Sequence, residues 1–369
     1  MDRRTRAIYE AHAAAWIGRR EVDAAALRRL RDFADALPER ARLADLGCGP
    51  GWFAERLRRR GHSVAALDAS SAMLRAARRA APRVPLVRGD LARLPFASGS
   101  LDGAWAKNSY LHLPFRELAP ALAELHRALR PGGRVTLSLL DFERAVPSAR
   151  ERARGIAQRR SRGERGLDGR LFSVPAPGLL RDLFAGAGFR AISVEAAERT
   201  WVRATRARGL PDSIRPGLRL LVVGLNPSPI AAANGVAFAG ANNRFWSAAK
   251  RAGWIERERD RDAALRRGIG FTDLVKRVTA SASALRPREY RRGIERVARL
   301  VRVHRPRAVV FVGLEGFRRA VDPSAQPGVL RGGFAGRPAY LTPSTSGRNA
   351  ATSLDSLVRH LRRALALAH

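Results

Sequence analysis

One uncharged amide follows an apolar segment in the second half of this chain. The segment Leu220-Leu-Val-Val-Gly-Leu-Asn-Pro-Ser-Pro229 places Asn226 where a buried strand would end, at the mouth of an α/β sheet. Phe238 follows, and a polar loop, Pro343-Ser-Thr-Ser-Gly-Arg348, lies near the C-terminus. An amide can hydrogen-bond a reactant but cannot act as a strong general base. Asn-Pro alone is usual in a turn, but these three features in this order around apolar strands predict a site.

A glycine-rich turn forms a second candidate site, in the first half of the chain. Asp45-Leu-Gly-Cys-Gly-Pro-Gly51 follows an apolar segment and precedes a helical one. Glycines let the backbone turn tightly and admit a ligand close to the main chain. Asp68 ends the next expected strand, where a carboxylate can accept hydrogen bonds from both hydroxyls of a ribose. Gly89-Asp90-Leu91 follows later, and the whole arrangement predicts a ribose-containing ligand.

Alternating strands and helices are expected to position both sites. Short apolar segments predict strands at 41–46, 63–67, 84–87, 101–105 and 134–140, then two closing strands within 191–203. The arginine-rich segment 150–170 is expected to be a loop or a frayed helix, and 179–188 a helix. In the second part, strands are expected from Leu218 and at 307–312 and 339–341, with helices at 288–304 and 353–368. This alternation predicts an α/β fold class with two doubly wound αβα domains.

The length and composition bound the organisation of the chain. At 369 residues it is too long for one ordinary core. Turn formers with little apolar pattern predict a linker at 209–217 between domains at 1–208 and 218–369. No signal peptide or membrane span is evident, so a cytosolic protein is expected. The single cysteine, Cys48, and scattered histidines predict no disulfide and no metal site.

The net charge of +36 suggests a polyanionic partner. The cations are almost all arginine, since Lys107, Lys250 and Lys276 are the only lysines. With so much alanine alongside, a GC-rich coding bias is an alternative explanation of this excess.

Residues from about Tyr9 to Arg208 resemble a class I S-adenosylmethionine-dependent methyltransferase of the small, type 11 kind. The matching segments are Asp45–Gly51, Leu67-Asp68, Gly89–Leu91, Tyr110-Leu-His-Leu-Pro114 and Leu129-Arg-Pro-Gly-Gly133. The resemblance implies S-adenosylmethionine as cofactor, with Gly47, Gly49 and Gly51 along its methionine and ribose portion. It also implies that Asp45 orients the amino-acid end and that Asp68 binds the ribose hydroxyls. Asp90, with Leu91 beside it, would bind the adenine amino group.

The sequence does not identify the methyl acceptor. DNA base-amine methyltransferases of similar fold carry Asp/Asn-Pro-Pro-aromatic after the fourth strand, whereas Asn108-Ser-Tyr-Leu111 lacks the prolines. Cytosine C5 methylation needs a thiolate, and Cys48 lies inside the cofactor turn, where a packing role is expected. Direct DNA methylation is therefore disfavoured. His112 or Tyr110 either faces an acceptor or packs in the core.

The chain from about Leu210 onward resembles the mismatch-specific uracil/thymine DNA glycosylases of the uracil-DNA glycosylase superfamily. The matching segments are Gly224-Leu-Asn-Pro227, Phe238, Asn243-Arg-Phe-Trp246, Gly270-Phe-Thr-Asp-Leu-Val-Lys276, Val312-Gly313 and Pro343-Ser-x-x-x-Arg348. The resemblance implies that uracil or thymine opposite guanine is flipped out of double-stranded DNA and removed without a cofactor.

The same resemblance assigns roles to four residues. Asn226 would position the attacking water, Phe238 would stack on the flipped base, Ser344 would bond a phosphate, and Arg348 would hold the gap in the duplex.

The chain departs from relatives in three places. The Asp and His of the stronger uracil-specific enzymes are absent, which predicts a slow enzyme. Ser346 stands where some relatives have a leucine wedge, and Ser228-Pro229 where many have glycine. Asn243 is expected either in the pocket or as a helix cap.

Three functional hypotheses follow. The first is a two-domain enzyme, expected to be a monomer in the cytoplasm and associated with the nucleoid. The second is a non-catalytic mismatch or lesion binder, against which the intact Asn226 argues. The third is a methyltransferase that the second domain delivers to DNA. The basic segment 150–170 either is a solvated loop or extends the DNA footprint.

Overall fold

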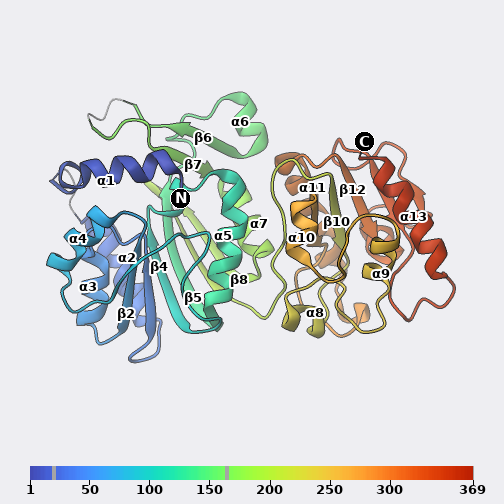
Figure 1. The fold of residues 1–369 in the computed structure, drawn as a ribbon, viewed down its shortest axis with the longest axis horizontal. Coiled ribbons are helices and arrows are strands. Elements are labelled where there is room, and N and C mark those ends of the chain that lie inside the picture. The colour runs from blue at the N-terminus through green and yellow to red at the C-terminus, as the bar shows by residue number, and fades with distance from the viewer. Residues whose placement is uncertain (19–21, 163–165, 369) are drawn as a thin grey trace. The chain divides into compact units, whose positions relative to one another are not determined.

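The computed structural model describes residues 1–18, 22–162 and 166–368, and its contacts divide the chain into two compact units. Unit 1 comprises Met1–Ala185 and Phe189–Ala207, and unit 2 comprises Gly186–Gly188 and Arg208–His369. The predicted fold class is confirmed, because in both units helices alternate with strands of a mainly parallel sheet (Figure 1). None of the helices in the described ranges is long and apolar enough to cross a membrane.

The sheet of unit 1 has seven strands in the order β3-β2-β1-β4-β5-β9-β8. Strands β1 to β5 are parallel, and β9 runs antiparallel to both β5 and β8. The strands are β1 (Arg42–Leu46), β2 (Ser63–Asp68), β3 (Leu86–Arg88), β4 (Leu101–Lys107), β5 (Leu129–Leu140), β8 (Phe189–Ala196) and β9 (Arg199–Arg206).

Helices cover this sheet and connect its parallel strands. They are α1 (Arg3–Gly18), α2 (Ala24–Asp35), α3 (Trp52–Arg59), α4 (Ser71–Ala80), α5 (Phe115–Ala128), α7 (Pro177–Gly186) and the short 3₁₀ helix η1 (Tyr110–His112). On one face, α2 and α3 bury Phe33 and Phe53 against Trp105 of β4, with ring centroids 5.8 and 5.5 Å from that indole. These contacts make Trp105 fully buried.

The arginine-rich segment 150–170 is more ordered than the sequence predicts. It contributes α6 (Ala149–Arg154) and β6 (Ile156–Arg160), which pairs antiparallel with β7 (Leu171–Pro175). The expectation of a loop or a frayed helix fits the short helix α6 but not the strand β6. A capping box of Ser148 and Glu151 starts α6, and Arg160 of β6 pairs with Asp2. Residues 163–165 of this segment lie outside the described residues.

The sheet of unit 2 has five strands in the order β11-β10-β12-β14-β13, all parallel except β13. The strands are β10 (Leu220–Gly224), β11 (Ile269–Asp273), β12 (Ala308–Val312), β13 (Gly328–Val329) and β14 (Ala339–Thr342). The helices are α8 (Pro229–Asn234), α9 (Phe245–Arg251), α10 (Arg261–Arg266), α11 (Pro287–His304), α12 (Leu314–Ala320), α13 (Leu354–Ala366) and the 3₁₀ helix η2 (Ala282–Ala284).

The segment 209–217, expected to be a linker, packs within unit 2. Leu210 and Ile214 are buried, and Ser213 exchanges two backbone hydrogen bonds with Phe271 of β11, at 2.8 and 2.9 Å. These residues therefore add a short antiparallel bridge to the edge of the sheet.

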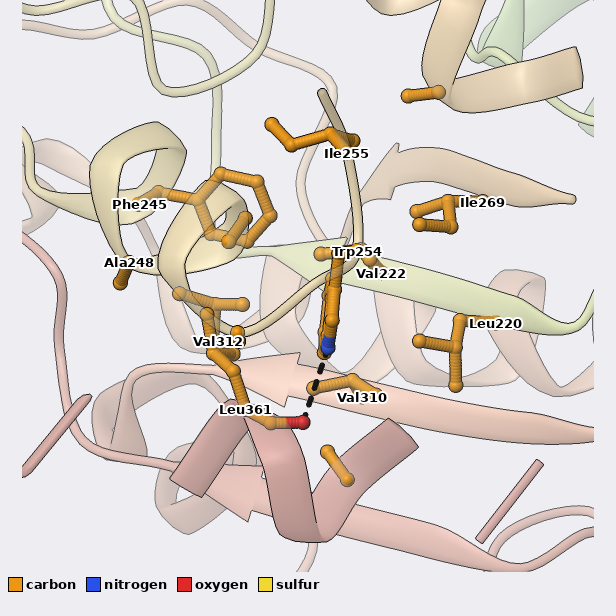
Figure 2. Close-up of a cluster of buried hydrophobic side chains, with 14 of the residues drawn as sticks. Leu220, Val222, Phe245, Ala248, Trp254, Ile255, Ile269, Val310, Val312 and Leu361 are labelled. Carbon is orange, nitrogen blue, oxygen red and sulfur yellow. Dashed lines mark hydrogen bonds between the residues drawn. The ribbon is translucent and has the colours of Figure 1, made fainter. Parts of the chain in front are cut away.

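Alternation along β10 and β12 divides the core of unit 2 between the two sheet faces. Leu220, Val222 and Val310 lie on the face covered by α9 and α13 (Figure 2). Trp254 lies in this cluster, and its indole Nε1–H donates to the carbonyl of Leu361 in α13 at 3.0 Å. The indole thus ties the last helix to the sheet through both burial and a hydrogen bond.

We expect Trp254→Phe to lower the free energy of unfolding of unit 2 by about 1–3 kcal/mol, because it removes a buried hydrogen bond and leaves space. Urea denaturation followed by circular dichroism measures the change. Val329→Ala is the control, since Val329 is 60% exposed and should change stability by less than about 0.5 kcal/mol. Equal stabilities of the two variants would contradict the role assigned to the indole.

Candidate functional sites

The glycine-rich turn of unit 1 begins where β1 ends. The backbone N–H groups of Gly47 and Cys48 both donate to the carbonyl of Leu67 in β2, at 2.7 and 2.9 Å. Gly47 and Gly49 have φ angles of +74° and +53°, which glycine adopts without strain. A Cβ on Gly47 would lie 2.2 Å from the Cβ of Ser109, so no side chain fits there. The turn therefore requires glycine for both its conformation and its packing.

Asp68 is bound to this turn by backbone donors. Its Oδ2 accepts from the N–H of Gly49 and its Oδ1 from the N–H of Ser70, each at 2.9 Å. Burial raises the pKa of Asp68, although these amide donors oppose the shift. An ionised carboxylate has about four lone-pair sites, so both oxygens can still accept bonds from a diol.

A cavity of about 550 Å³ opens beside the turn. Its lining includes the predicted residues Asp45, Gly47, Gly49, Asp68 and Leu91. Gly51 and Asp90 are not among the lining residues. Gly51, at φ +79°, starts α3, and a Cβ there would lie 3.1 Å from the Cβ of Ala77. Asp90 accepts from the N–H of Ala92 at 2.9 Å and from the amino group of Met1 at 2.7 Å.

Two buried polar atoms belong to residues that line this cavity. Asp45 Oδ2 and Ser109 Oγ are buried without a hydrogen-bond partner among the residues that the structure describes. Burial raises the pKa of Asp45 to about 7, and the nearby charge of Asp68 adds to the shift. Buried polar groups are normally paired, so a cationic or hydrogen-bonding ligand group fits beside them. The residues are thus suited to the amino-acid end of S-adenosylmethionine.

The structure also places His112, Tyr110 and Cys48, which the sequence analysis considered in connection with the methyl acceptor. His112 lines the cavity, whereas Tyr110 is buried outside it. Burial raises the pKa of the Cys48 thiol, so this side chain is not a thiolate nucleophile. Tyr9, Arg170 and Arg199 also line the cavity, and sequence reasoning gave none of them a role. No local motif marks them, because they come from α1, from the segment before β7 and from β9.

In unit 2, the candidate residues gather at the carboxyl edge of the sheet. Asn226 follows β10 and Ser344 follows β14, and β12 pairs in parallel with both strands. Because neighbouring strands lie about 4.8 Å apart, the two strand ends are separated by about 10 Å. The loop after β10 is also tied to the loop after β11, since Leu274 and Val275 donate to the carbonyls of Gly224 and Leu225, each at 2.8 Å.

The amide of Asn226 is held in one orientation. Its Nδ2 donates to Thr279 Oγ1 at 2.8 Å and lies 3.2 Å from the carbonyl of Pro227. Thr279 Oγ1 uses its own hydrogen on the carbonyl of Ser281, at 2.8 Å, so it can only accept from Asn226. The Nδ2 side is therefore engaged by the protein, and the Oδ1 atom is the acceptor presented by this residue.

Ser228 and Pro229, which stand where many relatives have glycine, start helix α8. Ser228 Oγ accepts from the N–H of Ala231 at 3.1 Å, and Pro229 occupies the first turn of α8. Serine at the N-cap and proline at the first helical position are a favourable pair. The loop after Asn226 is thereby fixed without glycine.

Phe238 lies over the end of β10 in a left-handed conformation, with φ +57°. Its ring stacks on Phe245, with centroids 4.3 Å apart and planes inclined by 25°. A Cβ on Gly224 would lie 3.4 Å from Phe238 Cζ and 2.8 Å from Asp273 Oδ1. The glycine thus lets the ring and the buried carboxyl group of Asp273 approach the same strand end.

The loop 343–349 is anchored to the segment before α9. The guanidinium of Arg244 donates to the carbonyl of Asn349 at 2.7 Å, and the backbone N–H of Arg244 donates to the carbonyl of Thr345 at 2.9 Å. Ser344 Oγ accepts from the N–H of Ser346 at 3.3 Å, and Arg348 is exposed. Asn243 Oδ1 accepts from the N–H of Phe245, the first residue of α9, at 3.0 Å, and this contact orders the turn that precedes the helix.

A buried ionic network supports the ends of β10 and β11, and sequence reasoning did not find it. Asp212 pairs with Lys276 at 2.7 Å and Arg296 at 2.8 Å, and Lys276 lies 3.4 Å from Asp273. Burial opposes ionisation of Asp212, but the two cations lower its pKa on balance. Asp212 lies in the expected linker, so no spacing in the sequence links it to the strand ends. Elsewhere, the described residues hold no group of His, Cys, Asp and Glu placed to bind a metal ion.

Comparisons with known proteins match two separate parts of the chain. Residues 43–133 match the family model described as methyltransferase domain, and residues 211–366 match that of the uracil DNA glycosylase superfamily. Malonyl-(acyl-carrier protein) O-methyltransferase of Erwinia pyrifoliae is 44% identical over 100 residues, which are 27% of this chain and 37% of the relative. The enzyme of that name from Dechloromonas aromatica is 44% identical over 126 residues, 32% of this chain and 45% of the relative. This chain therefore spans less than half of either relative.

Among solved structures, an S-adenosylmethionine-dependent methyltransferase from Mesorhizobium loti is similar to half of the chain. The identity is 24%, the match covers 50% of this chain and 98% of that one, and the TM-score is 0.38.

We expect the stability that Asp45 contributes to the ligand-free protein to be lost as the pH rises from about 4 through 7. The folded-state pKa of Asp45, about 7, lies above its ordinary value of 3.8, so the folded state binds this proton more tightly than the unfolded state. The resulting stabilisation is complete below about pH 4 and is lost as the pH passes 7. The melting temperature of the native protein, relative to that of Asp45→Asn, should fall as the pH rises across this range.

Asp32→Asn is the matched control, because Asp32 is exposed and its replacement should keep the native slope. Parallel curves for the native protein and Asp45→Asn would show that Asp45 is already ionised in the fold.

Proposed function

We propose that this chain, which contains a methyltransferase domain and a domain of the uracil DNA glycosylase superfamily, is a bifunctional enzyme. Unit 2 would hydrolyse the N-glycosidic bond of uracil or thymine mispaired with guanine in double-stranded DNA. Unit 1 would transfer a methyl group from S-adenosylmethionine to an acceptor. The observation that carries the first activity is the amide of Asn226, held by Thr279 at the carboxyl edge of the sheet.

The orientation of Asn226 suits it to hold a water molecule. With Nδ2 bound to Thr279, Oδ1 can accept a hydrogen bond from water. As the bond between the sugar and the base breaks, positive charge develops on the sugar and the water oxygen bonds to its anomeric carbon. The water loses a proton that Asn226 cannot take up, and this proton passes to the departing base or to solvent. The base must therefore leave readily, and uracil leaves more readily than cytosine. A slow, leaving-group-dependent glycosylase follows from this arrangement.

The neighbouring residues support a flipped base. Phe245 covers one face of the Phe238 ring, so a base would stack on the opposite face, an interaction worth about 1–3 kcal/mol. Ser344 is suited to a flanking phosphate because it lies in a loop anchored by Arg244. The exposed Arg348 extends from the same loop and would hold the gap that the flipped nucleotide leaves.

The methyltransferase proposal rests on the cavity of unit 1. When bound, S-adenosylmethionine supplies an activated methyl group. Asp68 would bind the ribose hydroxyls, Asp45 the ammonium group, and Gly47 and Gly49 would admit the ligand to the backbone. Asp90 and Leu91 remain proposed for the adenine end. The relatives' name, O-methyltransferase, supports oxygen as the acceptor atom.

A second candidate function is a methyltransferase that a non-catalytic unit 2 delivers to mismatched or damaged DNA. The Ser344–Arg348 loop would serve this role equally well. The ordered amide of Asn226 favours catalysis, because a binding module needs no fixed water-binding group at the strand end.

We expect Asn226→Ala to lower the rate of uracil release from a duplex with one G·U pair by about 100-fold, because the attacking water loses its hydrogen-bond partner. Single-turnover cleavage at the abasic site after alkali measures the rate, and gel-shift titration measures binding. Binding should stay within about threefold, since the residue makes no phosphate contact in this proposal.

Asn234→Ala is the matched control, because Asn234 is exposed at the end of α8 and its replacement should leave the rate unchanged. If the native protein binds the G·U duplex and never releases uracil, the non-catalytic alternative holds. Asp68→Ala should abolish S-adenosylmethionine binding in calorimetry while uracil release continues, which separates the two activities.

A further inference from the structure

We propose that Arg244 is a positioning residue for base flipping in unit 2, because it holds the turn Ser346–Asn349 in the conformation in which Arg348 can fill the gap in the duplex. The inference rests on the proposed glycosylase function and goes beyond it, since it separates a residue needed for flipping from the residues needed for bond cleavage. Arg244 contacts neither the base nor the attacking water in this proposal and acts only through the loop.

The loop after β14 ends in a tight turn of four residues, Ser346, Gly347, Arg348 and Asn349. The backbone N–H of Asn349 donates to the carbonyl of Ser346 at 3.0 Å, which closes the turn. The two central residues, Gly347 and Arg348, are exposed, whereas Thr345 just before the turn is buried. The side chain of Arg348 is therefore carried by an exposed turn that rises from a buried base.

The guanidinium of Arg244 contacts both ends of this turn and the segment that follows it. Its Nη2 donates to the carbonyl of Asn349 at 2.7 Å and lies 3.5 Å from the carbonyl of Ser346. Its Nη1 donates to the carbonyl of Thr352 at 2.5 Å, one residue before Ser353 caps α13. The planar guanidinium, with donors in a fixed geometry, thus joins the turn to the start of the last helix.

The backbone of Arg244 is fixed to the core of unit 2. Arg244 immediately precedes α9, whose first two residues, Phe245 and Trp246, are fully buried. The N–H of Arg244 donates to the carbonyl of Thr345, and the carbonyl of Arg244 accepts from the N–H of Ala248, each at 2.9 Å. The side chain therefore extends to the loop from an ordered helix start, and its hydrogen bonds order the turn in the same way.

A second contact fixes the tip of the turn. A Cβ on Gly347 would lie 2.7 Å from the Cβ of Asn242 and 2.8 Å from its carbonyl oxygen, so glycine is needed for this close approach. The Nδ2 of Asn349 also donates to the carbonyl of Ser344 at 2.9 Å and to Thr352 Oγ1 at 3.0 Å. The protein itself thus holds the turn at its tip and at both ends.

A rigid turn matters here because its residues, serine, glycine, arginine and asparagine, offer no apolar side chain to the base stack. Flipping a nucleotide costs its pairing and stacking energy. A loop that had to be ordered at the same moment would add a loss of conformational entropy, which a pre-organised loop avoids. We therefore expect Arg244 to raise the equilibrium between stacked and flipped nucleotide without changing the rate at which the flipped nucleotide reacts.

The first test measures flipping without turnover. The full chain at saturating concentration is mixed with a G·U duplex that carries 2-aminopurine beside a 2′-fluoro-substituted deoxyuridine. The fluorine destabilises the positively charged sugar and so prevents cleavage, and 2-aminopurine becomes more fluorescent when its neighbour leaves the stack. Arg244→Gln should lower the flipping equilibrium by about 10-fold, because the turn loses its hydrogen bonds to the guanidinium.

Arg302→Gln is the matched control for the loss of one positive charge. Arg302 is exposed in the last turn of α11, which ends before β12 begins. It therefore lies toward the amino edge of the sheet, opposite the site, and its replacement should leave the flipping equilibrium unchanged.

The second test separates flipping from bond cleavage. Uracil release is timed at saturating protein from a G·U duplex and from a duplex with uracil opposite an abasic-site analogue, where no base pair opposes flipping. Arg244→Gln should slow release from the G·U duplex by about 10-fold and release of the unpaired uracil by less than about threefold. Asn226→Ala should slow both, since it acts on bond cleavage. Arg244→Lys should not restore the G·U rate, because one ammonium group cannot bind the carbonyls of both Asn349 and Thr352.

Gly347→Ala tests the same role at the tip of the turn and serves if Arg244→Gln does not fold, which thermal unfolding detects. The new Cβ would displace the turn from Asn242, so the same selective loss on the G·U duplex is expected. Gly240→Ala is its matched control, because a Cβ there would lie 3.9 Å from the Cβ of Asn243, an ordinary van der Waals contact.

The outcomes distinguish this inference from the function on which it rests. If the native protein releases uracil and Arg244→Gln flips the nucleotide as well as the native protein does, the positioning role is overturned and the glycosylase proposal stands. Equal slowing of both duplexes also overturns it, as does full rescue by Arg244→Lys, which would indicate a simple charge contact with DNA. If the native protein neither flips nor releases uracil in either duplex, the glycosylase proposal itself is wrong.

Discussion

The carboxyl ends of neighbouring parallel strands meet at one edge of a sheet, and both candidate sites depend on this constraint. In unit 1, the carbonyl of Leu67 in β2 receives both N–H groups that begin the glycine turn after β1. In unit 2, the loop after β10 is bound to the loop after β11 by two backbone hydrogen bonds of 2.8 Å. Neither loop could keep its geometry without the neighbouring strand. The register of the parallel strands and their backbone hydrogen bonds therefore determine where Asp68 and Asn226 lie.

Both sites also contain a buried carboxyl group, and the two groups differ in their surroundings. Asp212 keeps its charge because Lys276 and Arg296 contact it directly, so this network stiffens the strand ends beneath the site. Among the residues that the structure describes, Asp45 Oδ2 has no such partner, and burial raises the pKa of Asp45 to about 7. A paired buried carboxylate is consistent with a structural role, whereas an unpaired one beside a cavity is suited to a ligand. Asp212 is therefore assigned a structural role, and Asp45 a role in ligand binding.

Local patterns in the sequence were sufficient for the fold class and for most of the elements. Apolar runs predicted strands such as β1 and β12, and glycine spacing predicted the turn beside the cavity, because these features depend on neighbouring residues in the chain. The failures involve contacts between distant segments. In the hairpin of β6 and β7, Arg160 pairs with Asp2, which lies far away in the sequence. The roles of Arg170, Arg244 and Asp212 were not predicted for the same reason, since only the folded chain brings these residues to their sites.

Asn226 and His112 are both poor bases, and this shared property limits the part that each can play in catalysis. Asn226 is an amide with its Nδ2 side engaged by Thr279, and His112 is a neutral imidazole with both ring nitrogens engaged. Hydrogen-bonded groups of this kind orient a reactant but do not remove its proton. In the proposed reaction of unit 2, the substrate must then be reactive on its own, as a base that leaves readily is. In that proposed reaction, the contribution of the protein is to position the reactants, and the selectivity follows from the intrinsic reactivity of the substrate.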